Sequence, residues 1–451
     1  MFITDSQTQN DLQIFSSGKS QPSIISIFEQ EISSHNGKTM LNLMFSHPLQ
    51  SKEEINDRSG YIRYFGTDVA QKIKVDNEAL DFIEYYLSLD IIPSRFSFID
   101  GLRKHVRQLF KANNEYYVIK RGIRWLIDTI DHLYGFANAC RTSGSSFVGK
   151  LADTIVDTIE RHALDRLTQQ KDKRLSFYTV EKFDYILRYL KKENVRKLLD
   201  IIYQIDVYQA AATVMQKHKL VFAEQTENVM LNVNQLFHPL LSNPVANSIT
   251  LGKDSNIVFI TGANMAGKST FMKALGITVY LAHMGFPVPA KSMQFSTCNG
   301  LFSSINVPDS LSLGYSHFYS EVQRIKLVAQ QMDESKSFVI IFDELFRGTN
   351  VKDAHEATVE IIKLFSGIKN SFFIFSSHIL EAAEELRSEL PDIQFKCFQT
   401  KLENNTLSYS YEMKDGISND RFGMYIIKKE EISEIIQLKK SLHIQAKSHE
   451  T

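Results

Sequence analysis

Residues 257–270, IVFITGANMAGKST, decide the fold of the carboxyl-terminal half of this 451-residue chain. The first four side chains are apolar and β-branched or aromatic, which predicts a buried strand. The pattern G-x-x-x-x-G-K-S follows, and residues 270 to about 281 have helical periodicity. A strand, a glycine-rich loop and a helix in this order form the context in which this pattern binds phosphate. The sequence therefore predicts a nucleotide phosphate-binding loop.

The loop is expected to bind the nucleotide through backbone hydrogen-bond donors and through two of its side chains. Its glycines let backbone N–H groups wrap around the β-phosphate, and the helix N-terminus adds unpaired donors and partial positive charge. Lys268 is expected to bridge the β- and γ-phosphates, and the hydroxyl of Ser269 to bind Mg²⁺. ATP and Mg²⁺ are therefore the predicted cofactors. The predicted nucleotide-binding residues are Gly262, Ala263, Asn264, Met265, Ala266, Gly267, Lys268, Ser269 and Thr270.

Two predicted strands downstream end in polar side chains. The run 338–342 ends in Asp343 and Glu344, and the run 372–375 leads to His378. Such side chains lie beside the phosphate loop, because the carboxyl ends of parallel strands share one edge of the sheet. Asp343 is expected to hold Mg²⁺, Glu344 to position or deprotonate the attacking water, and His378 to contact the γ-phosphate or that water. The predicted catalytic residues of a Mg²⁺-dependent ATPase are Lys268, Glu344 and His378.

The chain changes character along its length. Residues 1–23 are polar and without periodicity, which predicts a mobile tail. Residues 24–215 carry apolar side chains at three-to-four spacing, which predicts an all-α domain. Residues 216–430 alternate strand and helix patterns, which predicts an α/β domain with a largely parallel sheet. Residues 431–451 are predicted to form a helical tail.

Two closely spaced runs near the end of the α/β part form a separate pattern. Residues 393–398 and 407–411 are rich in strand-forming side chains and surround Glu403-Asn404-Asn405. Short polar connections of this kind are typical of antiparallel hairpins. The sequence therefore predicts a hairpin after the parallel strands.

Composition limits the class of protein. No stretch approaches the roughly 20 uninterrupted apolar residues that a membrane span needs. The polar amino terminus does not resemble a signal peptide. Three cysteines, widely spaced and odd in number, argue against a disulfide framework or a zinc cluster. We therefore expect a cytoplasmic protein without a membrane partner.

Charge is unevenly distributed, although 51 basic residues nearly balance 52 acidic ones. Between Gly101 and Asp200 there are 20 basic and 12 acidic residues. A basic segment on a neutral protein suits contact with phosphates, but Lys-rich helix surfaces are equally common without a ligand. The candidate phosphate contacts are Arg103, Lys104, Arg107, Lys120, Arg121 and Arg124.

Taken together, these motifs resemble the MutS family of DNA mismatch-repair ATPases, a branch of the ABC-type ATPases. The resemblance is strongest in the second half of the chain and fainter in residues 37–40 and 205–207, which are similar to the family's lever domain. It implies an α/β P-loop (ABC-type) ATPase domain preceded by an all-α lever domain. The similar stretches are TGANMAGKST (261–270), GFPVPA (285–290), LGYSHF (313–318) with Glu321, FDELFRGTN (342–350) and FSSH (375–378).

The resemblance also implies a composite site shared by two subunits. In this family two ATPase domains pair, and the signature loop of each closes over the nucleotide of the other. Ser316 would then contact the γ-phosphate held by the partner. The expected protein is a homodimer, paired through its ATPase domains and gated by ATP. It would act on DNA in mismatch repair or recombination, with the six basic residues above gripping phosphates without reading sequence.

The front half departs from the family pattern. Only some twenty polar residues precede the lever-like part, so a mismatch-reading domain is expected to be absent, and residues 24–215 are few for a lever with a clamp. The expected protein is therefore a short form. One alternative is an ATP-driven dimerising switch that binds a protein partner without direct DNA recognition. Another is a P-loop NTPase of a different lineage, which the run 347–350 (RGTN) disfavours.

Overall fold

The computed structural model describes residues 2–16, 22–90, 114–142, 146–305, 317–333, 335–403 and 406–418, with isolated positions beyond residue 428. The described chain forms two compact units that interleave along the sequence. We call them the helical unit and the sheet unit. The helical unit comprises Met1–Phe2, Gln13–Gln225 and Ile277–Met293, and the sheet unit Ile3–Leu12, Thr226–Gly276 and Gln294–Thr451.

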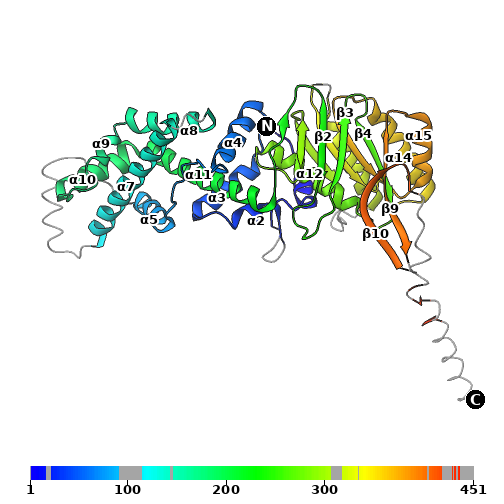
Figure 1. Ribbon diagram of the computed structural model, residues 1–451, viewed down its shortest axis with the longest axis horizontal. Coiled ribbons are helices and arrows are strands. Elements are labelled where there is room, and N and C mark those ends of the chain that lie inside the picture. Colours follow the sequence, from blue (N-terminus) through cyan, green and yellow to red (C-terminus); the bar gives the residue numbers. More distant parts are fainter. Residues whose placement is uncertain are drawn as a thin grey trace, which may run out of the picture. The chain divides into compact units, whose positions relative to one another are not determined.

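In the helical unit, all regular structure described between residues 24 and 218 is helical (Figure 1). Helix starts follow capping rules, since Ser34 and Ser51 accept hydrogen bonds from the backbone three residues on. The apolar side chains of Ala152, Ile155, Val156 and Ile159, which follow the three-to-four spacing, are buried. The helices are α2 (Ile24–Glu29), α3 (His35–Ser46), α4 (Lys52–Phe65), α5 (Asn77–Ser88), α7 (Asn114–Thr142), α8 (Ser146–Arg161), α9 (Asp165–Thr168), α10 (Phe177–Tyr185), the π-helical turn η1 (Ile186–Leu190) and α11 (Lys192–His218).

The segment 285–290 (GFPVPA) belongs to the helical unit, although the sequence predicted it within the α/β domain. Phe286 packs edge to face against Phe28 and Phe45, with ring centroids 5.2 and 5.4 Å away. Arg58 donates a hydrogen bond to the carbonyl oxygen just before the segment, that of Met284, at 3.0 Å. Burial of these apolar rings holds the segment among helices far from it in sequence.

The sheet unit is built on six strands in the order β10-β9-β4-β8-β7-β6. The four inner strands and β6 run parallel, and β9 and β10 form an antiparallel hairpin, drawn in orange at the carboxyl-terminal end of the described chain (Figure 1). The predicted parallel strands and hairpin are confirmed, and β6 is an additional parallel strand. The strands are β4 (Ile257–Gly262), β6 (Gly300–Ser304), β7 (Phe338–Asp343), β8 (Phe372–Ser376), β9 (Gln394–Glu403) and β10 (Thr406–Asp415).

Helices cover this sheet, which explains why its strands are apolar on both faces. Every residue of β7 and β8 is buried, as expected of parallel strands between helix layers. The helices are α12 (Lys268–His283), α13 (His317–Gln331), α14 (Val351–Ser366) and α15 (Leu380–Glu389). Smaller strands are β1 (Glu224–Gln225), β2 (Met230–Leu236), β3 (Asn247–Gly252) and β5 (Ser292–Phe295), of which β2 and β3 pair antiparallel.

The first residues of the chain differ from the predicted mobile tail. Residues Ile3–Leu12 belong to the sheet unit, where Ile3 bridges Gly300 in parallel and α1 (Ser6–Asp11) follows. Asp5 caps this helix by accepting from the backbone N–H of Thr8 at 2.9 Å. A six-residue polar helix has no periodic signal, and its stability comes from tertiary contacts. Among the described residues, no helix is both long and apolar enough to cross a membrane.

Candidate nucleotide site

Polar side chains from three neighbouring strands meet at the carboxyl edge of the six-stranded sheet. The strand β4 ends at Gly262 and enters the glycine-rich loop, while β7 ends at Asp343 and β8 at Ser376. Parallel pairing sets Asp343 opposite Ser376. A cavity of about 680 Å³ opens at this edge, which suits a ligand of nucleotide size.

Lys268 is a buried cation, with its side chain 4% exposed. Its ammonium donates to the carbonyl oxygens of Gly262 and Ala263 at 2.7 and 3.2 Å, and Glu344 Oε1 lies 3.8 Å away. Burial lowers the pKa of the Lys268 ammonium, and the nearby carboxylates of Glu344 and Asp343 partly oppose this. An ammonium satisfied mainly by neutral carbonyls is poised to pair with an anion such as a phosphate.

Two hydroxyls orient the buried carboxylate of Asp343. Ser269 Oγ donates to one of its oxygens, and Ser376 Oγ donates to the other. Mg²⁺ typically binds through one or two protein oxygen ligands and fills its shell with waters and substrate phosphates. Within the described part of the chain no group of three or more His, Cys, Asp or Glu could hold a metal by itself. The Ser269 hydroxyl and the Asp343 carboxylate supply oxygen atoms of the kind that a nucleotide-bound Mg²⁺ takes as ligands.

Glu344 lies among three basic side chains. Its Oε2 is 2.8 Å from Arg347 Nε and 4.0 Å from His378 Nδ1, and its Oε1 faces Lys268. The backbone of Glu344 has φ +53°, a conformation that costs energy for a residue with a side chain. This geometry points the carboxylate into the cavity, where it can orient a water molecule.

Most of the predicted nucleotide residues are brought together here. Gly262 and Ala266 belong to the loop without lining the cavity, and His378 lies beside Glu344 without lining it. At Gly262 φ is +142° and the carbonyl oxygen of Phe398 would lie 2.6 Å from a Cβ, so only glycine fits. The predicted residues that line the cavity are Ala263, Asn264, Met265, Gly267, Lys268, Ser269, Thr270, Asp343 and Glu344.

The predicted partner contact and half of the predicted DNA contacts lie outside the described residues, namely Ser316, Arg103, Lys104 and Arg107. The remaining three, Lys120, Arg121 and Arg124, are on α7. The guanidinium of Arg121 lies over the ring of Trp125 at 4.3 Å, and Arg124 donates to the carbonyl oxygen of Lys173 at 3.2 Å. Both arginines are therefore partly engaged in packing within the helical unit.

Sequence reasoning missed the aromatic residues at the cavity, among them Tyr411. Tyr411 of β10 lines it and has φ +56°, and its Cδ1 would lie 3.3 Å from a Cβ placed on Gly267. The side chain of Asn247 fixes this irregular stretch by donating to the carbonyl oxygen of Tyr411 at 3.0 Å and accepting from Met413 N at 2.7 Å. A break in strand register follows Tyr409, and no local pattern in the sequence marks it.

A histidine on the same cavity wall was also missed as a site residue. His238 is buried, and burial together with the charge of Lys273 lowers its pKa to about 4. Its imidazole is therefore neutral at physiological pH. It presents an uncharged ring to the cavity.

Comparison with known proteins finds one family model and several relatives that match part of this chain. Residues 258–446 match the family model of MutS domain V. The chain is 29% identical over 242 residues to the DNA mismatch repair protein MutS of Staphylococcus haemolyticus, which covers 52% of this chain and 27% of that protein. It is 26% identical over 378 residues to that of Aquifex pyrophilus, covering 80% of this chain and 44% of that protein.

These matches span less than half the length of the relatives. MutS domain V is a P-loop ATPase domain, in agreement with the strand–loop–helix and the acidic strand end described above. Residues 258–446 of this chain therefore resemble a MutS domain V, and the chain is similar to MutS proteins over the matched part.

Proposed function

We propose that this chain binds and hydrolyses ATP with Mg²⁺ and acts on DNA as an ATP-gated dimer. The observation that carries the ATPase proposal is the convergence of Lys268, Ser269, Asp343 and Glu344 on one cavity. They come from two strand ends more than 70 residues apart, and each has the chemistry that phosphoryl transfer requires.

Each side chain then has a defined task. Lys268 exchanges its contacts with the loop carbonyls for the β- and γ-phosphate oxygens, which restores charge pairing to a buried ammonium. Ser269 and Asp343 hold Mg²⁺, which when bound neutralises charge on the phosphates. Glu344 orients the attacking water and accepts its proton.

Two neighbours of Glu344 adjust that reaction. Arg347, whose Nε lies 2.8 Å from Glu344 Oε2, pairs with this carboxylate and fixes its orientation. His378 is exposed at 60% of its side chain and is free to reach the γ-phosphate once a nucleotide is in place. Ser316 of a second copy would complete the site from the other side.

Action on DNA is proposed from the relatives, which are named DNA mismatch repair proteins. The helical unit would serve as the lever that transmits nucleotide-driven change to the DNA, gripping phosphates through basic side chains. One observation favours the alternative, a switch that binds a protein partner: Arg121 and Arg124 already have partners within the helical unit.

The substitution Glu344→Gln tests the catalytic assignment. The amide keeps the shape of the carboxylate but cannot accept a proton, so ATP should remain bound while turnover falls by about 10²- to 10⁴-fold. A nucleotide-dependent dimer, measured by light scattering with ATP, should accumulate. Turnover at the unmodified rate would refute the role of Glu344.

DNA binding is tested by a salt titration with homoduplex, mismatched and branched DNA, with and without ATP. Phosphate-dominated binding loses affinity steeply as salt rises. Absence of binding to all three substrates at low salt would reject the DNA proposal and favour the protein-partner switch. The proposal that the chain hydrolyses ATP would stand whatever the result of this titration.

A further inference from the structure

The amino-terminal segment (Ile3–Leu12) forms part of the sheet unit although the rest of that unit begins at residue 226. Ile3 N donates to the carbonyl oxygen of Asn299 at 2.8 Å, and Leu301 N donates to that of Ile3 at 2.9 Å. Gly300 lies between these contacts, and a Cβ there would collide with the carbonyl oxygen of Ile3. The segment is thus bonded to β6, the edge strand of the six-stranded sheet.

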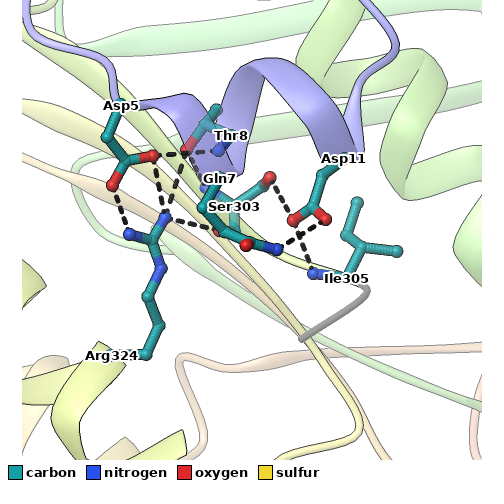
Figure 2. A network of polar contacts seen from close by, with 7 residues as sticks. All are labelled: Asp5, Gln7, Thr8, Asp11, Ser303, Ile305 and Arg324. Atoms are coloured by element: carbon teal, nitrogen blue, oxygen red, sulfur yellow. Dashed lines mark hydrogen bonds and ion pairs between the residues drawn. The ribbon is translucent and has the colours of Figure 1, made fainter. Parts of the chain in front are cut away.

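Side chains of α1 then hold the end of β6 (Figure 2). The carboxylate of Asp11, 2% exposed, accepts from Ser303 Oγ and from Ile305 N, both at 2.8 Å. Thr8 Oγ1 accepts from Ser303 N at 3.0 Å. Because the N–H groups of an edge strand otherwise lack partners on one side, these bonds fix where β6 ends.

The same segment holds α13 through one arginine (Figure 2). Arg324, with its side chain 9% exposed, donates to both carboxylate oxygens of Asp5. It also donates to Thr8 Oγ1 at 3.1 Å and to the carbonyl oxygen of Ser303 at 2.6 Å. Burial alone would raise the pKa of Asp5, but the hydrogen bonds and charge of Arg324 hold it below its ordinary value. The pair is therefore fully ionised at neutral pH.

The amino-terminal end of α13 contacts the loop that carries the proposed catalytic glutamate. We call residues 344–348 the catalytic loop. A Cβ on Gly348 would collide with Phe318 N and lie 2.8 Å from His317 Cβ. The rings of Phe318 and Phe346 pack with centroids 5.6 Å apart, and Phe346 is buried with φ +63°. The first turn of α13 is thus in tight contact with the catalytic loop at Gly348 and Phe346.

We propose that the amino-terminal segment is a brace that positions the catalytic loop through α13, with Arg324 as its positioning residue. Arg324 lies six residues beyond Phe318 on the same helix, about 9 Å along the axis. Loss of its anchor lets α13 shift, and the tight contacts at Gly348 and Phe346 pass that shift to Glu344 and Arg347. Packed contacts of this kind move together because protein interiors have few voids.

The proposal rests on the proposed ATPase function, and charge reversal tests it. Asp5→Arg and Arg324→Asp each place like charges together, whereas the double variant restores an opposite pair in swapped order. Each single variant should lower kcat by about ten-fold, and the double variant should recover most of the lost kcat. A coupling of this size is within the range for residues in contact. The KM for ATP should change by less than about two-fold, because β8 and β7 separate the phosphate-loop strand β4 from β6.

Amide hydrogen exchange supplies a readout that does not need turnover. Exchange in α13 and in the catalytic loop should accelerate in each single variant and return toward the original rate in the double. If the unmodified chain hydrolyses no ATP, the proposed function is refuted. The exchange rates of α13 and the catalytic loop still test the brace in that case. Singles with unchanged exchange and turnover, or a double that recovers neither, would overturn the proposal.

A matched control is available in the helical unit, where Arg141 and Asp153 form an exposed pair at 3.0 Å. Reversing these two charges in the same way should leave kcat and exchange of the catalytic loop unchanged, because exposed pairs contribute little. Should a reversal at Asp5 prevent folding, Asp5→Asn keeps the shape and removes the charge. It is then expected to speed exchange in α13, and an unchanged rate would count against the brace.

Discussion

Each of the two units buries a cation, but the two cations differ in the contacts that they make. In the helical unit Arg188, 3% exposed, pairs with Asp184 through two hydrogen bonds of 2.6 and 2.5 Å. It also donates to the carbonyl oxygen of Leu89 at 3.0 Å, and Tyr86 OH donates to Asp184 at 2.9 Å. Despite burial, the Asp184 carboxylate raises the pKa of Arg188. In the sheet unit Lys268 is equally buried, yet its nearest carboxylate lies 3.8 Å away.

The direction of the pKa shift separates a structural cation from a ligand-binding one. Burial lowers the pKa of Lys268 because its contacts, mainly to carbonyl oxygens, do not replace the water that it lost. Arg188 is fully compensated within the fold and offers nothing to a ligand. We therefore expect Arg188 to determine stability without affecting nucleotide binding, and Lys268 to do the reverse.

The largest expected effect is on stability, from Arg188→Ala. This variant leaves Asp184 buried without its partner, which should lower the free energy of unfolding by about 3–5 kcal/mol. Denaturant unfolding of the helical unit measures it, with ATP affinity of the folded protein unchanged. Replacing both partners by apolar residues, Arg188→Met with Asp184→Leu, should cost much less. An equal loss in the double variant would contradict the pairing argument.

The next effect is on nucleotide chemistry, from Lys268→Ala. Removing the cation that faces the phosphates should lower kcat/KM for ATP by about 10²- to 10³-fold. Stability should stay constant or rise, since an incompletely compensated buried charge is lost. Thermal unfolding without nucleotide, beside steady-state hydrolysis, tests both halves. A marked fall in Tm would show that Lys268, like Arg188, stabilises the fold and would contradict this prediction.

The smallest effect concerns Tyr411, an aromatic side chain that lines the same cavity. Tyr411→Ala should weaken ATP binding by about ten-fold, in line with the worth of stacking a base on an aromatic ring. Tyr411→Phe keeps the ring and serves as the control, expected to bind as the unmodified chain does. Equal affinity for ATP and for inorganic triphosphate in the unmodified chain would exclude a base contact at this position.

In the sheet unit, the sequence predicts Lys268 and the two acidic residues near it, but it does not predict the other residues that shape the site. Lys268, Asp343 and Glu344 lie at strand ends whose patterns are local, so periodicity and motif spacing were sufficient to bring them together. Tyr411 and Asp5 could not be found this way. Their positions depend on an irregular hairpin and on contacts with Arg324, 319 residues from Asp5 in the chain. Local patterns carry no record of such distant partners.

The sequence predicts that the helical unit is made of helices, but it does not predict how the helices pack. Apolar spacing identified its helices, while the Arg188–Asp184 pair, one helical turn apart, resembles an ordinary surface pair in the sequence. Nothing local distinguishes it from the exposed Arg161–Asp157 pair of the same spacing. Burial, which decides the difference in energy, is a property of the assembled unit.

The brace also affects the order in which this protein is made and folded. Asp5, Thr8 and Asp11 leave the ribosome well before their partners Ser303 and Arg324, which are synthesised about 300 residues later. At roughly 5–20 residues per second, the segment waits on the order of 15–60 s for the strand and helix that bind it. A segment that is translated early is therefore among the last to reach its final position, and the sheet unit cannot be completed until β6 and α13 have emerged.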